Sequence, residues 1–161
     1  MLRGIGSDGR SRASVSHGRY SPGMERQPAD KTRLPNDLVD LFTTDRLGHV
    51  SALRADGSIA TYLMWIDWDG EHVLTSSAVG SRKGAHWRRD PQASMSVVDA
   101  DDPWRFVIVR GRVTDIRPDE DLAFIDKMSL RYTGDPYRFR GSAREIFVIT
   151  PDHVRASRGR R

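Results

Sequence analysis

Residues 55–70 read ADGSIATYLMWIDWDG, and this stretch decides the fold because it places one apolar run between two Asp-Gly pairs. Asp-Gly is a favoured pair at the tight turn of a β-hairpin. We therefore predict a strand over residues 59–68, joined by hairpins to strands at 48–54 and 71–76. Three consecutive strands joined by tight turns indicate an antiparallel sheet.

The predicted strand over 59–68 has large apolar residues on both of its faces, since they occupy odd and even positions alike. A strand of this kind needs cover on both sides. The cover comes either from the inside of a barrel together with a helix, or from a second subunit.

The rest of the chain continues this pattern of strands with interposed helices. Further strands are predicted at 93–98, at 104–116 and at 145–150 with a continuation through 153–156, and helices at 36–44, 81–90 and 118–133. Gly111 in the middle of a strand indicates a β-bulge or the close approach of another backbone. The sum is about six strands in a mainly β (α+β) fold, an antiparallel barrel with flanking helices. No Gly-x-Gly-x-x-Gly turn follows a strand, which argues against a Rossmann fold.

The predicted helix at 81–90 begins with a hydroxyl and two cations, Ser81, Arg82 and Lys83. A helix N-terminus offers free N–H groups and a positive dipole end, so this arrangement suits a phosphate. Both cationic side chains are expected to face solvent in the absence of ligand. Arg82, His86 and Arg89 follow at i, i+4 and i+7 and form one basic stripe. From these residues alone, a solvated basic helix with an ordinary serine cap is an equal alternative.

Length and composition suit a single domain of 161 residues with 37% hydrophobic residues and a formal net charge of +4. Residues 1–31 are poor in large apolar side chains and are expected to be a disordered extension. A simpler interpretation of this segment is that residues 1–23 precede a true start at Met24. The folded domain is expected over 32–157, followed by a basic tail at 158–161. Because much of the positive charge lies in the termini, nucleic-acid binding is not expected.

Several classes of site and location are not expected. The chain has no cysteine, which excludes disulfides and thiolate chemistry. The acidic loop at 99–103 lacks matching His or Glu spacing, so no metal site is expected. No segment has the length and hydrophobicity of a membrane helix or signal peptide, and we expect a cytoplasmic protein without membrane contact.

Several motifs in this order resemble one family. They are MWIDWDG at 64–70, SRK with RRDPQAS at 81–94, DADDPWR with VRGRV at 99–113, and RYTG at 131–134. The chain resembles the split β-barrel flavin and deazaflavin oxidoreductases, which include pyridoxamine 5′-phosphate oxidase, over residues 36–157. The RRDP and YTG pieces are most similar to the actinobacterial branch that uses the deazaflavin coenzyme F420.

The resemblance implies a six-stranded FMN-binding type of split barrel and a homodimer with two cofactors in grooves between the subunits. It implies that the cofactor phosphate is held by Ser81, Arg82 and Lys83, that the ring and its side chain lie against Met64, Trp65, Thr75 and Ser76, and that Trp104 closes the site from the partner subunit. The chain departs from the family at Ile59, where many relatives have proline, and at His86, where many have asparagine. By residue type alone, Met64 and Trp65 in a strand that is apolar on both faces are more typical of a hydrophobic core than of a cofactor site.

The activity implied is F420-dependent transfer of a hydride between the reduced cofactor and a small unsaturated or quinone-like substrate. Because the cofactor performs the chemistry, no catalytic residue is assigned, and the proton comes from water or Tyr62. The alternatives are an FMN-dependent enzyme similar to pyridoxamine or pyridoxine 5′-phosphate oxidase and a non-catalytic split barrel that binds a cofactor. Neither the substrate nor the direction of transfer follows from the sequence.

Overall fold

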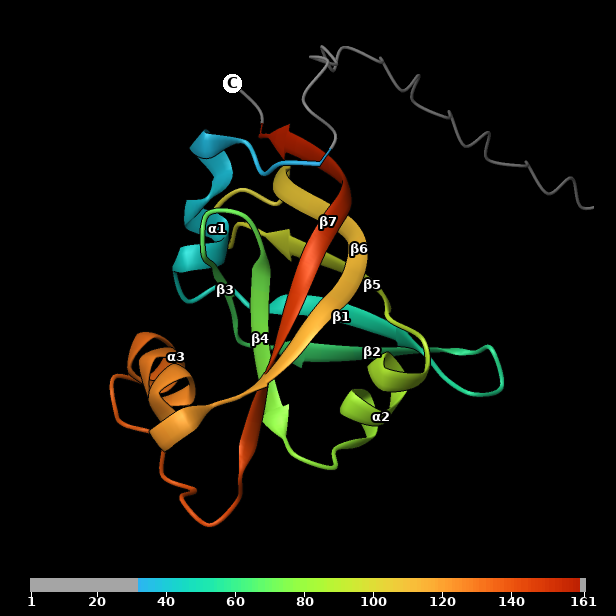
Figure 1. Cartoon of the computed structure of the whole chain (residues 1–161). Coiled ribbons are helices and arrows are strands. Elements are labelled where there is room, and N and C mark those ends of the chain that lie inside the picture. The colour runs from blue at the N-terminus through green and yellow to red at the C-terminus, as the bar shows by residue number, and fades with distance from the viewer. Residues whose placement is uncertain (1–31, 160–161) are drawn as a thin grey trace, which may run out of the picture.

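The computed structural model describes residues 32–159, and its strands form one antiparallel sheet (Figure 1). The strands are β1 (Gly48–Leu53), β2 (Ile59–Met64), β3 (Ile66–Trp68), β4 (Val73–Ala78), β5 (Gln92–Val98), β6 (Arg105–Pro118) and β7 (Arg144–Arg158). The helices are η1 (Asn36–Leu38), α1 (Asp40–Thr43), α2 (Arg82–Arg89), η2 (Glu120–Leu122) and α3 (Ala123–Thr133). The predicted N-terminal extension and residues 160–161 lie outside the described residues, and Arg158, predicted to begin the basic tail, belongs to β7.

Both predicted Asp-Gly hairpins are confirmed. β1 pairs antiparallel with β2 and β3 pairs antiparallel with β4. The turn glycines have positive φ, +81° at Gly57 and +106° at Gly70, a conformation that glycine adopts without steric cost. The turn chemistry therefore set these two strand pairings.

The predicted strand over 59–68 is not one strand, and the sheet has seven strands instead of six. It is interrupted at Trp65 into β2 and β3, which lie at opposite edges of the sheet order β2-β1-β5-β6-β7-β4-β3. The two edges are thus consecutive in the chain, but no strand pairing joins β2 to β3 and the sheet is not closed by hydrogen bonds. The Thr75 hydroxyl donates to the Trp65 carbonyl at 2.8 Å and holds the bend. Nothing in the apolar pattern marks this position, because the residue at the bend is itself apolar.

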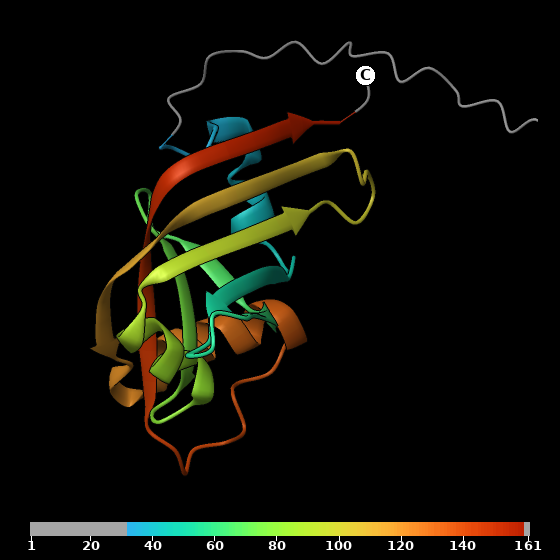
Figure 2. The ribbon, with the colours of Figure 1, turned by 90° about the vertical axis from the view of Figure 1, so that its right-hand side faces the viewer.

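The long antiparallel pair of β6 and β7 runs the length of the sheet, and β5, β6 and β7 sweep across one side of the molecule (Figure 2). At Gly111 a Cβ atom would lie 2.2 Å from the Thr150 carbonyl oxygen, and the register with β7 shifts between Arg110 and Gly111. The predicted bulge and the predicted close backbone approach are therefore both present. β7 continues through the bulge as one strand instead of a strand with a separate continuation.

The predicted N-terminal helix forms as η1 and α1, and three of its four apolar residues are fully buried. Leu38, Leu41 and Phe42 belong to the main core cluster together with the inward-facing residues of the sheet, among them Val50, Val97, Val107 and Phe147. The outer face of β4 and β7 carries a second cluster of Leu74, Ile146 and Val148, covered by Phe124 of α3. The helices thus bury both faces of the sheet at β4 and β7.

The third helix begins later than its predicted start at residue 118. Asp121 and Leu122 have positive φ and break the first turn. Asp119 is buried, and its carboxylate accepts the backbone N–H groups of Phe124 at 2.8 Å and Ile125 at 3.0 Å. This side chain supplies the cap that the first turn of α3 needs.

The outer face of β2 has no cover within residues 32–159. Ile59 and Leu63 are 68% and 63% exposed, whereas Ala60 and Met64 on the opposite face are buried. The predicted need for cover on both faces is therefore met on one face only. Among the described residues, no helix has the length and apolarity that crossing a bilayer requires.

Candidate functional site

The predicted anion-binding helix forms as α2 and is firmly anchored to the sheet. Ser81 is its N-cap, and the hydroxyl accepts the Gly84 N–H at 3.2 Å. Trp87 is buried with its ring centroid 4.8 Å from that of Phe147. Arg88 forms an ion pair with the buried carboxylate of Glu145 on β7. These contacts fix the direction in which the first turn of α2 points.

A hollow of about 170 Å³ lies between α2 and α3, and we call it the α2–α3 hollow. The two helices lie on either side of the end of β4 (Figure 1). The residues that line the hollow come from both helices, from β2, β4 and β7 and from the segments between them. They are Leu63, Met64, Trp65, Ser76, Lys83, Ile125, Met128, Tyr137 and Arg144. Four of the nine predicted cofactor residues, Met64, Trp65, Ser76 and Lys83, are therefore brought together in one place.

The two apolar residues predicted to contact the cofactor ring occupy different environments. Met64 is 4% exposed and is part of the main core, although it also reaches the hollow. Trp65 stacks on Tyr132 with 5.3 Å between ring centroids. The Tyr132 hydroxyl in turn donates to the Arg46 carbonyl at 2.6 Å. Trp65 thus lines the hollow and is held in position by its stacking on Tyr132. Met64 belongs to the main core and also lines the hollow.

The remaining predicted residues do not line this hollow. Thr75 is fully buried, and its hydroxyl donates a hydrogen bond to the Trp65 carbonyl. Arg82 is exposed at the start of α2 and His86 is half-buried further along it. Trp104 is 44% exposed in the turn between β5 and β6, at the end of the sheet opposite to α2 (Figure 2).

The expectation that Lys83 faces solvent is wrong. It is half-buried, with its Nζ 5.4 Å from the centre of the Tyr62 ring. Burial, and to a smaller extent the charge of Arg144, lower the pKa of Lys83 below the usual value for lysine. The basic stripe along α2 is likewise partly engaged, because Arg89 donates to the Leu53 carbonyl.

Arg144 also lines the hollow and is a candidate site residue that the sequence did not reveal. Its Nε donates to the Ser76 hydroxyl at 3.2 Å and its Nη1 to the Tyr137 hydroxyl at 3.0 Å. The guanidinium also lies 4.9 Å from the centre of the Tyr137 ring. Arg144 lies just after the segment 135–142, which carries Arg and Tyr side chains. No local spacing in the sequence connects this part of the chain with Lys83.

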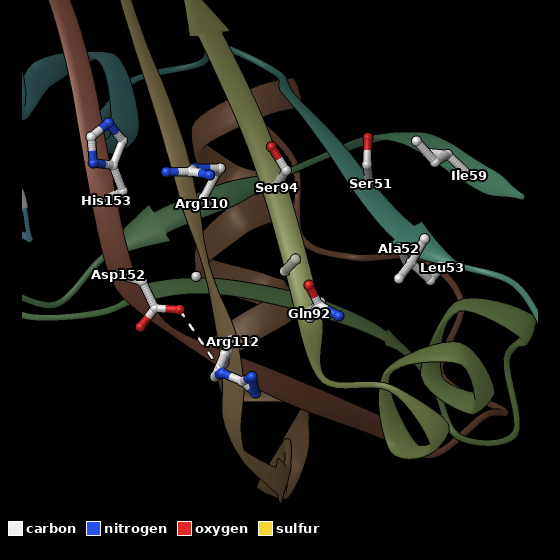
Figure 3. A pocket seen from close by; sticks show the side chains of 12 residues that line it. Ser51, Ala52, Leu53, Ile59, Gln92, Ser94, Arg110, Arg112, Asp152 and His153 are labelled. Carbon is white, nitrogen blue, oxygen red and sulfur yellow. Dashed lines mark ion pairs between the residues drawn. The ribbon is translucent and has the colours of Figure 1, made fainter. Parts of the chain in front are cut away.

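A larger pocket of about 440 Å³ lies on the outer face of the sheet, over β1, β2, β5, β6 and β7 (Figure 3). Leu53 and Ile59 line one side of it, and Arg110, Arg112 and His153 the other. The only ion pair drawn in this view joins Arg112 to Asp152 at 4.0 Å. The outer face is therefore mixed apolar and basic and is hollowed next to the exposed edge strand β2.

Comparisons with known proteins agree with this architecture. Residues 34–158 match the family model described as pyridoxamine 5′-phosphate oxidase. A solved structure named F420 reductase is 32% identical, with a TM-score of 0.69 over 76% of this chain and 98% of its own. No curated protein sequence matches the chain.

Two more distant structures share the fold. A conserved hypothetical protein from Mycobacterium tuberculosis is 23% identical, with a TM-score of 0.65 over 83% of this chain and 90% of its own. General stress protein 26 from Bacillus anthracis is 17% identical, with a TM-score of 0.58 over 77% and 93%. The family model spans nearly all of the described residues, and the chain belongs to the pyridoxamine 5′-phosphate oxidase family.

Proposed function

We propose that this protein is an F420-dependent oxidoreductase that transfers a hydride between the reduced deazaflavin and a small unsaturated or quinone-like substrate. The family and the 32% identity to an F420 reductase support an oxidoreductase of the flavin or deazaflavin kind. The choice of F420 over FMN depends, in addition, on the resemblance of the RRDP and YTG motifs to the F420 branch.

One observation carries the proposal: Lys83 meets Ser76 and Trp65 in the hollow at the start of α2. A cation at a helix N-terminus, beside a hydroxyl and a flat aromatic wall, suits a ligand with a phosphate and a ring system. Lys83 with the Arg82 side chain and the first turn of α2 would hold the phosphate, and Trp65 with Met64 would contact the ring.

When bound, F420 supplies the hydride chemistry. The residues of this chain bind the cofactor, orient it and exclude water from one of its faces. We assign the chain no nucleophile and no general base. The Tyr62 hydroxyl and water are the candidate proton donors, and the Tyr62 ring lies beside Lys83 at the edge of the site.

We also propose that the working form is a homodimer. The α2–α3 hollow, at about 170 Å³, is smaller than the roughly 300–1,000 Å³ of ligand pockets, so it encloses only one end of a cofactor. Leu63 borders this hollow and Ile59 borders the outer-face pocket, and both are largely exposed. A second subunit on the outer face of β2 would cover both residues and complete the groove, with Trp104 of that subunit as the closing side chain.

FMN is the second candidate cofactor, because the chain belongs to the pyridoxamine 5′-phosphate oxidase family and an FMN-dependent enzyme of that kind is the alternative that the sequence leaves open. Parallel titrations with F420 and FMN separate the two candidates. We expect colourless purified protein that quenches F420 fluorescence and binds FMN more weakly. A yellow protein that retains FMN would overturn the F420 proposal.

The double variant Arg82→Ala/Lys83→Ala tests the position of the cofactor phosphate. We expect an F420 dissociation constant raised at least about a hundredfold, because two charge-assisted contacts are lost, with an unchanged circular dichroism spectrum. Unchanged affinity in a folded variant would refute the phosphate assignment. F420 binding without turnover across enones, quinones and nitroaromatics would indicate a non-catalytic cofactor-binding protein instead.

A further inference from the structure

Two cations line the α2–α3 hollow, Lys83 from α2 and Arg144 from the first residue of β7. Neither forms an ion pair within residues 32–159, whereas Arg88, Arg131 and Arg140 each pair with a carboxylate. The neighbouring carboxylate of Glu145 is already paired with Arg88. The hollow therefore contains two positive charges and no compensating acid.

The Arg144 side chain is held in position before any ligand binds. Ser76, which is 9% exposed, accepts from its Nε, and Tyr137 accepts from its Nη1. The loop that carries Tyr137 is fixed in turn, because Asp126 of α3 accepts the Tyr137 N–H at 3.0 Å and an Arg140 N–H at 2.7 Å. Nη2 has no partner among the described contacts, so a guanidinium donor remains available in a fixed place.

Holding two like charges near each other in a half-buried site is unfavourable without an anion between them. Burial lowers the pKa of Lys83, and the charge of Arg144 lowers it further by a smaller amount, which is the repulsion between the two cations. An anionic oxygen group would relieve it and would accept charge-assisted hydrogen bonds from both side chains.

We propose that Lys83 and Arg144 together bind one anionic oxygen group, a phosphate or a carboxylate, inside the α2–α3 hollow. The apolar walls of Trp65, Ile125 and Met128 then contact the uncharged body of the same ligand. The inference rests on the proposed function only in that the group belongs to the cofactor or to its substrate. It places the principal partner of Lys83 on β7 and not at Arg82, its exposed neighbour in sequence.

The test is a calorimetric titration of the ligand-free protein with inorganic phosphate at low ionic strength. For Lys83→Gln and for Arg144→Gln we expect the dissociation constant to rise at least about tenfold, the effect of losing one charge-assisted hydrogen bond. Arg155→Gln is the matched control, since Arg155 is exposed on the same strand and forms no ion pair among the described residues. It makes the same change of charge and should alter the constant less than about twofold.

If Arg144→Gln does not fold, Arg144→Lys and Ser76→Ala take its place. Arg144→Lys keeps the charge and loses the fixed fork, while Ser76→Ala removes the acceptor that orients Nε, and each should weaken phosphate binding. Phosphate binding that is equal in wild type and folded Arg144 variants would overturn the proposal. An equal loss in all variants, Arg155→Gln included, would also overturn it, since it would indicate nonspecific attraction.

A second titration distinguishes the two sources of the anion and separates this inference from the proposed function. If the cofactor phosphate fills the site, protein saturated with F420 no longer binds inorganic phosphate. If the site takes the anionic group of the substrate, phosphate still binds to the F420-loaded protein with the same dependence on Arg144. Arg144-dependent phosphate binding by a protein that binds no F420 would refute the proposed function while leaving this site in place.

Discussion

At the residue scale, Trp87 shows how α2 is attached to the sheet. The side chain is 2% exposed and packs on Phe147, yet its indole N–H is buried without a hydrogen-bond acceptor among the described residues. A buried donor without a partner destabilises the folded state, whereas the surrounding ring contacts stabilise it. We expect the ring packing to contribute more to the free energy of unfolding than the unpaired indole N–H takes away. The two effects can be measured separately.

We expect Trp87→Phe to change the free energy of unfolding by less than about 1.5 kcal/mol, because the loss of ring area is offset by removal of the unpaired N–H. Trp87→Ala should lower it by about 3–5 kcal/mol, because a cavity is left under α2. Urea unfolding of both variants measures the difference. A phenylalanine variant as unstable as the alanine variant would show that the indole N–H contributes a stabilising bond.

At the scale of elements, the position of α3 depends on one buried carboxylate in β3. Asp67 is 2% exposed and lies 2.5 Å from Lys127 Nζ and 2.8 Å from Arg131 Nη2. Arg131 also donates to the Ile66 carbonyl at 3.1 Å. α3 supplies Ile125 and Met128 to the hollow, so this ion-pair cluster sets one wall of the candidate site.

Asp67→Asn should lower the free energy of unfolding by about 3 kcal/mol, at the low end of the range for breaking a buried pair, since Arg131 is left without its counter-ion. Amide hydrogen exchange along α3 should speed up in the same variant. Lys127→Gln is the control, and because the lysine side chain is 59% exposed its effect should be below about 1 kcal/mol. Equal effects of the two substitutions would contradict the role given to Asp67.

At the scale of the whole molecule, the two ends of the described chain are joined by ion pairs. Asp37 in η1 pairs with Arg158 at 2.6 Å, and Arg105 pairs with Asp40 at 2.6 Å and with Asp99 at 2.7 Å. The hydrogen bond from Arg158 lowers the pKa of Asp37, and that from Arg105 lowers the pKa of Asp99. η1, α1 and the β5–β6 turn are therefore held together by charge at the end opposite to the candidate site.

Because Asp37 and Asp99 have lower pKa values in the folded than in the unfolded chain, their ionised carboxylates stabilise the fold above about pH 3.9, the usual aspartate value. This stabilisation is lost as the pH falls through the folded values, so the Tm should drop between about pH 5 and pH 2. Arg105→Gln removes a shared partner, and its Tm should lie below that of the wild type at pH 7 and approach it in acid. A constant difference in Tm across this range would contradict the linkage.

Local chemistry in the sequence determined the elements that depend on neighbouring residues. The Asp-Gly turns at 56–57 and 69–70, the serine cap of α2 and the bulge at Gly111 were all predictable, because each depends on the conformational preference of one or two residues. The motifs around these elements were enough to indicate the family, and they predict the start of α2 as part of a candidate site.

Only the tertiary structure decided where the strand over 59–68 breaks and which cations meet. The bend at Trp65 exists because β2 pairs with β1 at one edge of the sheet and β3 pairs with β4 at the other, and no local pattern specifies such a pairing. Lys83 and Arg144 come together because β7 lies beside β4 and returns the chain to the end of the sheet where α2 begins. Two charges that are far apart in sequence interact strongly only when the fold brings them close in space. No local pattern in the sequence gives that distance.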